Sequence, residues 1–167
     1  MKIFISVGTH EIGFLRLLKL VSKIESHDLT VQFGSSAFTN SSILADKCFD
    51  FCSYDEMVNH AIDSDVIVGS ASPGLANLAW EYGCVFIGMP RLHKYDEAVD
   101  DHQVDFVLHL VNLGGCIHLK PEDDLNAILE AIESDKNSIL EKQKICQKIF
   151  NKRIESVQKS VVDFFLQ

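Results

Sequence analysis

The chain has 167 residues, 47% of them apolar, and a formal net charge of −9 at pH 7. This size and composition are typical of one globular domain, and the negative charge argues against a general nucleic-acid binder, because phosphate neutralisation needs clustered Lys and Arg. No window is long and apolar enough to span a membrane. Met1 and Lys2 lead directly into an apolar run, so we expect no signal peptide and a cytoplasmic location.

Apolar runs of strand length alternate with helical patterns along the chain. In chain order, the pattern predicts a strand over 2–8, a helix over 11–25, a strand over 29–34, a short strand near 48–52, a helix over 54–62, a strand over 65–69, a helix over 73–82 and a strand over 84–88. A helix over about 97–112, a short strand near 115–119, a helix over 122–133 and a long helix from about 138 follow. This alternation predicts an α/β fold with a doubly wound, mostly parallel, Rossmann-like sheet covered on both faces. We expect ligands at the carboxyl ends of its strands.

Two parts are expected, an α/β domain over 1–135 and a C-terminal amphipathic helix over 136–167. From Phe150 to Phe164, the second part repeats apolar residues at spacings of three and four, with basic residues beside them. This apolar stripe either packs on the domain or binds a partner subunit or an acidic membrane surface.

The first predicted strand runs into the sequence Val7-Gly8-Thr9-His10-Glu11. A glycine lets the backbone approach a ligand, and the free N–H groups of a helix start attract anions. The stretch matches neither G-x-G-x-x-G nor G-x-x-x-x-G-K-[ST], which disfavours a dinucleotide enzyme and a P-loop NTPase. A purely structural turn between strand and helix stays open for this loop.

A second strand-to-helix turn lies in "GSASPGLANLAWEYG", residues 69–83. Ser72 is typical of a helix N-cap and Pro73 of the first helical position, which leaves the N–H groups of Gly74 and Leu75 without intrahelical partners. The first turn contains no carboxylate. The sequence therefore predicts a helix start that accepts phosphate.

The same turn has a rival interpretation as the nucleophile elbow of a hydrolase. The spacing around Ser72 approximates G-x-S-x-G, and Asp101 and His102 follow in the order that an α/β-hydrolase uses. However, an elbow takes one oxyanion-hole N–H from the residue after the serine, and Pro73 has none. We therefore disfavour the hydrolase.

The stretch "PRLHKYDEAVDDHQ", residues 90–103, leaves the fifth predicted strand. Arg91, His93 and Lys94 are candidates for contact with phosphate or with a partner. The acidic, imidazole and amide groups over 100–103 are of the kind that hold sugar hydroxyls. The alternative is a charged loop that faces only water.

Metal-binding patterns are absent or badly placed. Asp63-Ser64-Asp65 reads as the D-x-D of metal-dependent glycosyltransferases, but it precedes a strand, so we interpret it as a helix-to-strand turn. The seven histidines show no metal-type spacing, and the five cysteines, an odd number without C-x-x-C, suit buried reduced thiols. We predict no metal and no cofactor.

With these residues in view, the chain resembles the C-terminal donor-binding domain of glycosyltransferase family 28, in its short stand-alone form. That form is the soluble subunit of two-component polysaccharide glycosyltransferases, and it is similar to the catalytic subunit of the enzyme that adds the second GlcNAc to a dolichol-linked sugar. The resemblance covers roughly residues 1–130 and rests on "IFISVGTHEIGFLRLLK", "FDFCSYDEMVNHAIDSDVIV" and "PRLHKYDEAVDDHQ".

The resemblance implies one half of a GT-B glycosyltransferase that takes a hexose or N-acetylhexosamine from a UDP-sugar without a metal. A separate, membrane-anchored partner chain would hold the lipid-linked or polysaccharide acceptor, so that this chain, with its nucleotide-sugar site over 1–135, would reach the inner face of the membrane only through the partner. The implied substrate-binding residues are Gly8, Thr9, Ser72, Pro73, Gly74, Leu75, Arg91, Lys94 and Gln103, and the catalytic candidates are His10, Asp101 and His102.

One position departs from the family pattern. The family reads S-H-A-G-P-G-S-x-x-E where this chain has 69–78, and its glutamate holds the ribose hydroxyls; here Leu78 stands in its place, and Ser70 replaces the histidine. Charge-assisted hydrogen bonds are worth roughly 1.5–3 kcal/mol each, so this loss would weaken nucleotide binding by about tenfold or more. Two functions therefore stay open: a working donor subunit with an altered ribose contact, and a non-catalytic relative that stabilises or regulates a transferase partner.

Overall fold

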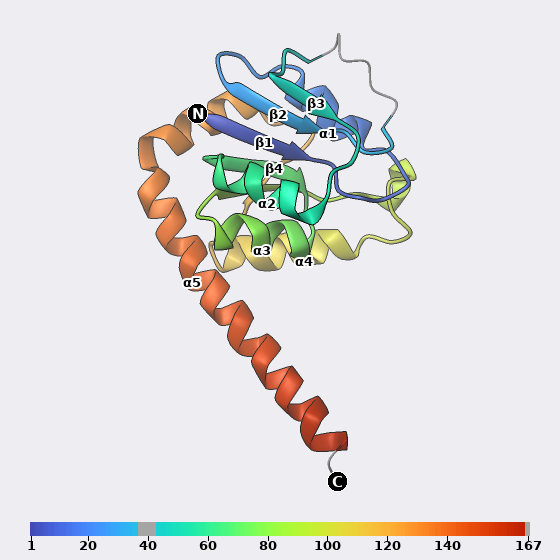
Figure 1. The fold of residues 1–167 in the computed structure, drawn as a ribbon, viewed down its shortest axis with the longest axis vertical. Coiled ribbons are helices and arrows are strands. Elements are labelled where there is room, and N and C mark those ends of the chain that lie inside the picture. The colour runs from blue at the N-terminus through green and yellow to red at the C-terminus, as the bar shows by residue number, and fades with distance from the viewer. Residues whose placement is uncertain (37–42, 166–167) are drawn as a thin grey trace.

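The structure is a computed structural model that describes residues 1–36 and 43–165. Within these residues, parallel strands form one six-stranded sheet in the order β3-β2-β1-β4-β5-β6. Figure 1 shows its first four strands, β3-β2-β1-β4. The strands are β1 (Lys2–Ser6), β2 (Asp28–Gln32), β3 (Lys47–Phe49), β4 (Val66–Ser70), β5 (Val85–Met89) and β6 (Ile117–His118). The predicted α/β, doubly wound, Rossmann-like fold is confirmed, and its strand order reverses between β1 and β4.

Helices cover both faces of the sheet. They are α1 (Leu15–Val21), α2 (Tyr54–Ile62), α3 (Pro73–Glu81), the short 3-10 helix η2 (His93–Tyr95), α4 (His102–Asn112) and α5 (Leu125–Phe165). α1 and the first turns of α5 pack on one face, while α2, α3 and α4 pack on the other (Figure 1). The two layers explain why β4 and β5 are buried along their whole length.

Side chains of β1 show how alternation fills both cores. Ile3 and Ile5 belong to the core under α1, and Phe4 between them belongs to the core under α2 and α3. Successive side chains of a strand point to opposite faces, so an apolar run builds two cores at once. This explains why the strands read as continuous apolar segments rather than as alternating ones.

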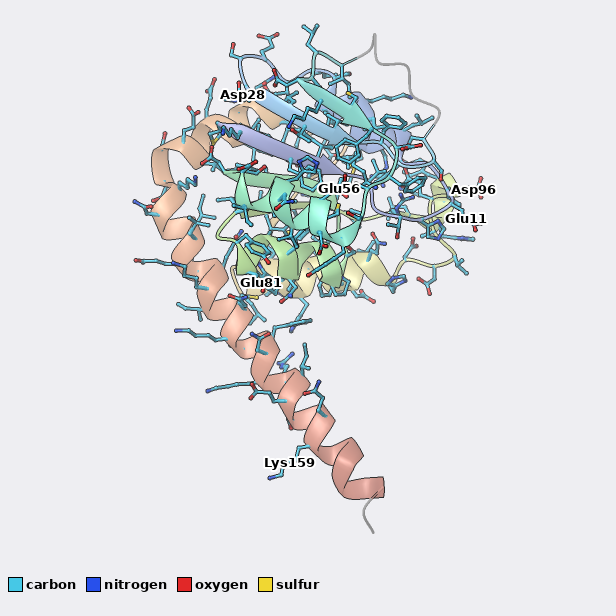
Figure 2. All side chains as sticks on the ribbon, in the orientation of Figure 1. Glu11, Asp28, Glu56, Glu81, Asp96 and Lys159 are labelled. Atoms are coloured by element: carbon cyan, nitrogen blue, oxygen red, sulfur yellow. The ribbon has the colours of Figure 1, made fainter. Side chains whose placement is uncertain are left out.

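The last helix passes from one core to the other. Ile132 packs in the core under α1, whereas Cys146 lies in the core under α3, and the backbone between them leaves helical geometry at Asp135 (φ −136°, ψ 27°). Just after this kink, Lys136 forms an ion pair with Asp65, at the amino end of β4. α5 thus runs across the boundary expected at 135/136, and its final part, which carries Lys159, projects away from the sheet (Figure 2).

Two helices begin later than the sequence pattern predicts. α1 begins at Leu15 rather than near residue 11, because the carbonyl groups of Ile12 and Gly13 accept hydrogen bonds from a distant arginine instead of from helical amides. α4 begins at His102 rather than near residue 97, after a left-handed residue, Asp96 (φ 55°), has ended η2. Both delays leave irregular loops at the carboxyl edge of the sheet.

Candidate functional site

A cavity of about 830 Å³ lies at the carboxyl ends of β1, β2 and β4. This is where the strand order reverses, the place at which open α/β sheets bind their ligands. Glu11, in the cavity wall, lies at the opposite edge of the sheet from Asp28, which begins β2 (Figure 2). The cavity is lined by Ser6, Val7, Gly8, Thr9, His10, Glu11, Ile12, Gln32, Cys52, Tyr54, Met57, Ser70, Ser72, Gly74, Leu75, Leu78, Arg91 and Gln103.

A closed set of hydrogen bonds fixes the polar floor of this cavity. The hydroxyl of Ser6, the last residue of β1, donates to Oε1 of Gln32, the last residue of β2, over 2.5 Å. The side-chain amide of Gln32 donates to the backbone carbonyl of Gly8 (3.3 Å), and the backbone amide of Gly8 donates to Ser6 Oγ (3.2 Å). Because Ser6 and Gln32 are both fully buried, these bonds hold the loop that follows β1 against the sheet.

Gly8 is conformationally required at this position. Its φ of +84° lies in the left-handed region, and a Cβ there would lie 3.3 Å from Ser70 Oγ. The chain can therefore turn sharply out of β1 while its backbone stays next to the end of β4.

The start of α3 forms one wall of the cavity. Ser72 is the N-cap and Pro73 the first helical residue, as predicted, and there is no acidic residue in the first turn. The Ser72 hydroxyl accepts a hydrogen bond from the Leu75 amide at 3.4 Å, so one of the two amides expected to face phosphate is already engaged. Among the described residues the Gly74 amide has no acceptor, which leaves it and the positive end of α3 available to an anion.

The loop over 7–14 forms the opposite wall. Since α1 begins only at Leu15, the amides over 9–11 belong to an irregular loop and not to a helix start. Within the described residues these amides donate to no protein atom, while the Ile12 amide donates to Nδ1 of His10 (3.1 Å). The loop thus supplies free backbone donors without the helix that the sequence predicts.

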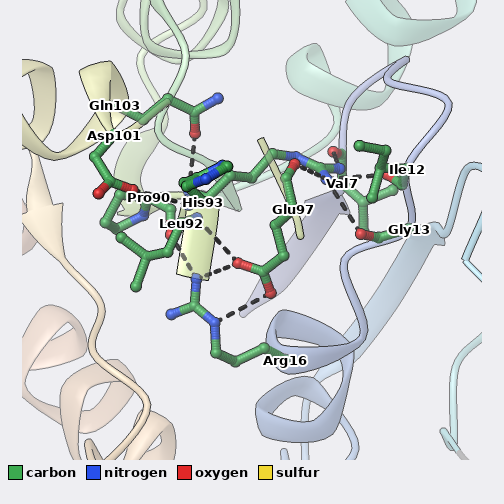
Figure 3. Close-up of polar contacts among 11 residues, drawn as sticks. Val7, Ile12, Gly13, Arg16, Pro90, Leu92, His93, Glu97, Asp101 and Gln103 are labelled. Atoms are coloured by element: carbon green, nitrogen blue, oxygen red, sulfur yellow. Dashed lines mark hydrogen bonds and ion pairs between the residues drawn. The ribbon is translucent and has the colours of Figure 1, made fainter. Parts of the chain in front are cut away.

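Arg91 lies beneath this loop and is only 2% exposed. Its guanidinium donates to the carbonyl groups of Val7 (2.8 Å), Ile12 (3.0 Å), Gly13 (3.2 Å) and Glu97 (3.2 Å), in the region shown in Figure 3. Burial lowers the pKa of Arg91, and the nearby carboxylate of Glu97 opposes this shift. Arg91 reaches the cavity wall, but most of its hydrogen-bonding capacity is used inside the protein.

Four predicted site residues do not line the cavity. Pro73 directly precedes Gly74, whose backbone amide is free among the described residues. Lys94 has its ammonium 5.0 Å from the centre of the Tyr95 ring. Asp101 accepts a hydrogen bond from the His93 amide (2.8 Å), and exposed His102 pairs with Asp100. The cavity does bring together the other eight: Gly8, Thr9, His10, Ser72, Gly74, Leu75, Arg91 and Gln103.

Leu78 lies in the cavity wall and is 4% exposed. Asn77 and Glu81 do not line the cavity, so neither brings a polar group to this part of the wall. Cys52, another residue of the wall, is a neutral thiol, because burial and then the charge of Glu56 raise its pKa. The described wall contains only one carboxylate, that of Glu11.

Sequence reasoning missed several residues of the wall. Ser6 and Ser70 each end a strand whose earlier residues are mostly apolar, and Gln32 follows Val31 at the end of β2; this change from apolar to polar was the signal available in the sequence. Tyr54 and Met57, in the first turns of α2, had no such signal, since only the fold brings α2 to this edge.

The opposite edge of the sheet has a smaller hollow of about 280 Å³, lined by residues that include Lys2, Asp28, His60 and Asp63. Asp63 ends α2 and Asp65 accepts hydrogen bonds from the Lys2 amide and from Lys136, so this D-x-D stretch is a helix-to-strand turn, as predicted. In the ranges 1–36 and 43–165, no group of three His, Cys, Asp or Glu residues is placed to hold a metal ion. No helix of this described part has the length and apolar character needed to cross a membrane.

No family model matches the sequence, and no curated protein matches it. Similar solved structures include the glycotransferase of kitacinnamycin, with 14% identity and a TM-score of 0.63 over 88% of this chain and 38% of that chain. They also include MurG of Acinetobacter baumannii, with 18% identity and a TM-score of 0.58 over 86% and 44%, and CalG4, the calicheamicin glycosyltransferase, with 13% identity and a TM-score of 0.61 over 88% and 37%. The chain shares the α/β, Rossmann-like fold of one part of these glycosyltransferases, and it spans less than half the length of the three structures. At such identities the likeness establishes the fold and not the activity.

Proposed function

We propose that this chain is the donor subunit of a two-component glycosyltransferase and that its cavity binds a UDP-sugar. The observation that carries the proposal is the cavity at the reversal of strand order, between the ends of β1 and β4, with free backbone amides in two of its walls. Its volume of about 830 Å³ suits a nucleotide-sized ligand. The glycosyltransferase fold makes a nucleotide-sugar the ligand of choice.

The diphosphate is proposed to lie between the loop over 8–11 and the start of α3. Gly74 offers a free amide at the positive end of α3, and the loop offers the free amides of Thr9, His10 and Glu11. Backbone amides fixed before the reaction stabilise the negative charge that develops on UDP as the sugar leaves, and such preorganised donors are usually a major source of rate.

His10 and Gln103 are the wall residues we assign to the reacting end of the ligand. Oε1 of Gln103 already accepts a hydrogen bond from the Arg91 amide (3.0 Å), so its amide NH₂ is the part left to donate to a sugar or phosphate oxygen. We keep His10 as the group that orients the acceptor hydroxyl. Asp101 and His102 enter this scheme only if the segment over 93–102 moves toward the cavity on binding.

A hexose or N-acetylhexosamine is the transferred group in this proposal, and no metal is involved. The acceptor would be held by a membrane-anchored partner chain at the cytoplasmic side, since the described fold corresponds to less than half of the similar glycosyltransferases. The proposed division into a donor domain over 1–135 and a partner-binding or packing helix over 136–167 belongs to the same scheme.

One observation favours a second function, that of a non-catalytic subunit which stabilises or regulates a transferase partner. Leu78 is a buried apolar wall residue at the position where, by the resemblance to family 28, a glutamate would hold the ribose hydroxyls, and Asn77 and Glu81 do not line the cavity. Calorimetric titration of UDP, UDP-glucose and UDP-GlcNAc into the purified chain separates the two functions. A donor subunit binds UDP at or below millimolar concentration, whereas the absence of binding at millimolar UDP would favour the non-catalytic function.

A further inference from the structure

Arg91 holds the loop over 7–13 from below. Its four acceptors are backbone carbonyls, three of them in this loop, so the buried guanidinium engages those oxygens within the protein. The neighbouring amides of Thr9, His10 and Glu11 remain without protein acceptors among the described residues. Because Arg91 engages carbonyl oxygens of the loop and these amides stay free, a ligand at this wall meets hydrogen-bond donors.

The carboxylate nearest to Arg91 is bound by a different arginine. Glu97, whose side chain is 8% exposed, accepts hydrogen bonds from Arg16 over 3.2 Å (Nε to Oε1) and 2.6 Å (Nη2 to Oε2), and one from the Leu92 amide (3.1 Å), as Figure 3 shows. Within the described residues, Arg91 forms no ion pair with any carboxylate. Arg16, Arg91 and Glu97 therefore leave one positive charge in excess, and that charge lies beneath the loop.

We propose that Arg91 is a positioning residue for the anionic group of the ligand, and that the Arg16–Glu97 ion pair keeps it in that role by holding the carboxylate away. The idea rests on the proposed function, because it assumes that the loop over 8–11 meets a diphosphate. It differs from the expectation that Arg91 binds phosphate directly: Arg91 acts through the loop, and Arg16 and Glu97, which do not line the cavity, become determinants of anion binding.

Removal of Arg16 is the diagnostic change. In Arg16→Met, Glu97 is left nearly buried without its partner, and an unpaired buried carboxylate is costly. The Glu97 carboxylate can lower this cost by pairing with the Arg91 guanidinium. This new ion pair draws the guanidinium away from the loop carbonyls and cancels the positive charge of Arg91. In the double variant Arg16→Met/Glu97→Gln the carboxylate is gone, so Arg91 returns to the loop and the net charge of the cluster is again +1.

The experiment compares the dissociation constants of UDP and uridine, since uridine shares the base and ribose but lacks the diphosphate. We expect Arg16→Met and Arg91→Met each to weaken the affinity for UDP by about tenfold or more, while the affinity for uridine changes by less than about threefold. The double variant should return the affinity for UDP to within about threefold of the wild type. The matched control is Lys19→Met, which removes one charge from an exposed position later in α1 and should leave both ligands unchanged.

Three results would overturn the proposal. A loss of UDP binding in Arg91→Met but not in Arg16→Met would mean direct contact between Arg91 and phosphate. Equal weakening of UDP and uridine would mean a general structural role, and failure of the double variant to recover would exclude capture of Arg91 by Glu97. Should Arg91→Met not fold, Arg16→Met and the double variant still decide the question.

Failure of the proposed function gives a different pattern. If the wild type binds neither ligand, amide hydrogen exchange of the free protein still tests the positioning role. We expect exchange over 8–14 to be faster in Arg16→Met than in the wild type and to be restored in the double variant. Unchanged exchange in Arg16→Met would contradict the role of Arg91 independently of any ligand.

Discussion

Ser72 closes the first turn of α3 on Leu75: its hydroxyl accepts a hydrogen bond from the Leu75 amide, 3.4 Å away, and leaves the Gly74 amide without an acceptor among the described residues. Loss of this cap in Ser72→Ala should lower the free energy of unfolding by about 1 kcal/mol. Ser72→Gly is the matched control and should cost only a few tenths of that amount. Urea unfolding measures both, and equal stability of the Ala variant and the wild type would show that the 3.4 Å contact does not stabilise α3.

Leu78 should determine the strength of ribose binding. In Leu78→Glu, a carboxylate enters the cavity wall and accepts hydrogen bonds from ribose hydroxyls, so we expect UDP and uridine to bind about tenfold more tightly than in the wild type. Leu78→Gln, of similar shape but neutral, should give a smaller gain. Calorimetry with both ligands provides the comparison, and unchanged affinity in the Glu variant would show that the ribose lies elsewhere.

Phe150 should couple α5 to the sheet domain. Its ring centroid is 5.8 Å from that of Trp80, in an edge-to-face arrangement, and the Trp80 indole donates to the Gly115 carbonyl over 2.8 Å. Phe150→Ala should lower the unfolding free energy by about 2 kcal/mol, less than for a fully buried phenylalanine, because Phe150 is only partly buried. It should also shift the fluorescence emission of Trp80, the single tryptophan.

The control for this prediction is Ile154→Ala, one turn further along α5, where the side chain is 43% exposed. Its effect should stay within about 0.5 kcal/mol, and Trp80 emission should not change. Emission that is equally insensitive to Phe150→Ala would indicate that α5 does not pack on Trp80 in solution.

The ion pair between Asp65 and Lys136 should make stability depend on pH. The hydrogen bond from Lys136 lowers the pKa of Asp65 in the folded protein, so the pair contributes stability above the unfolded pKa of about 3.9 and loses it as pH falls through the lower folded value. Lys136→Met should therefore unfold at a lower urea concentration than the wild type at pH 7. This difference between the two urea midpoints should become smaller below about pH 4. A gap that stays constant over this range would exclude the ion pair as its cause.

Local chemistry explains the parts of the fold that the sequence predicts well. Ser72 and Pro73 are found at the N-cap and first helical positions because a cap depends on a few neighbouring residues. The kink of α5 at Asp135 falls in the gap predicted between 133 and 138. Apolar runs were sufficient to identify the strands, since a sheet covered on both faces needs buried residues on both sides.

Long-range contacts explain the rest. The start of α1 is delayed because Arg91, nearly eighty residues later in the chain, takes the carbonyl groups of Ile12 and Gly13. The pairing of Ser6 with Gln32 depends on the register of two strands, which no local pattern specifies. The burial of Arg91 has the same origin: the sequence predicts contact with phosphate or a partner, and only the fold shows that the guanidinium is buried under a loop.

A titration of nitrogen-15-labelled protein with UDP, followed by NMR amide shifts, tests the central claim most directly. The account predicts that the largest shifts gather on the amides of Thr9, His10, Glu11 and Gly74, where two cavity walls offer free donors. Shifts that gather instead around Lys2, Asp28 and His60, at the opposite edge of the sheet, or no shifts at millimolar UDP, would contradict it.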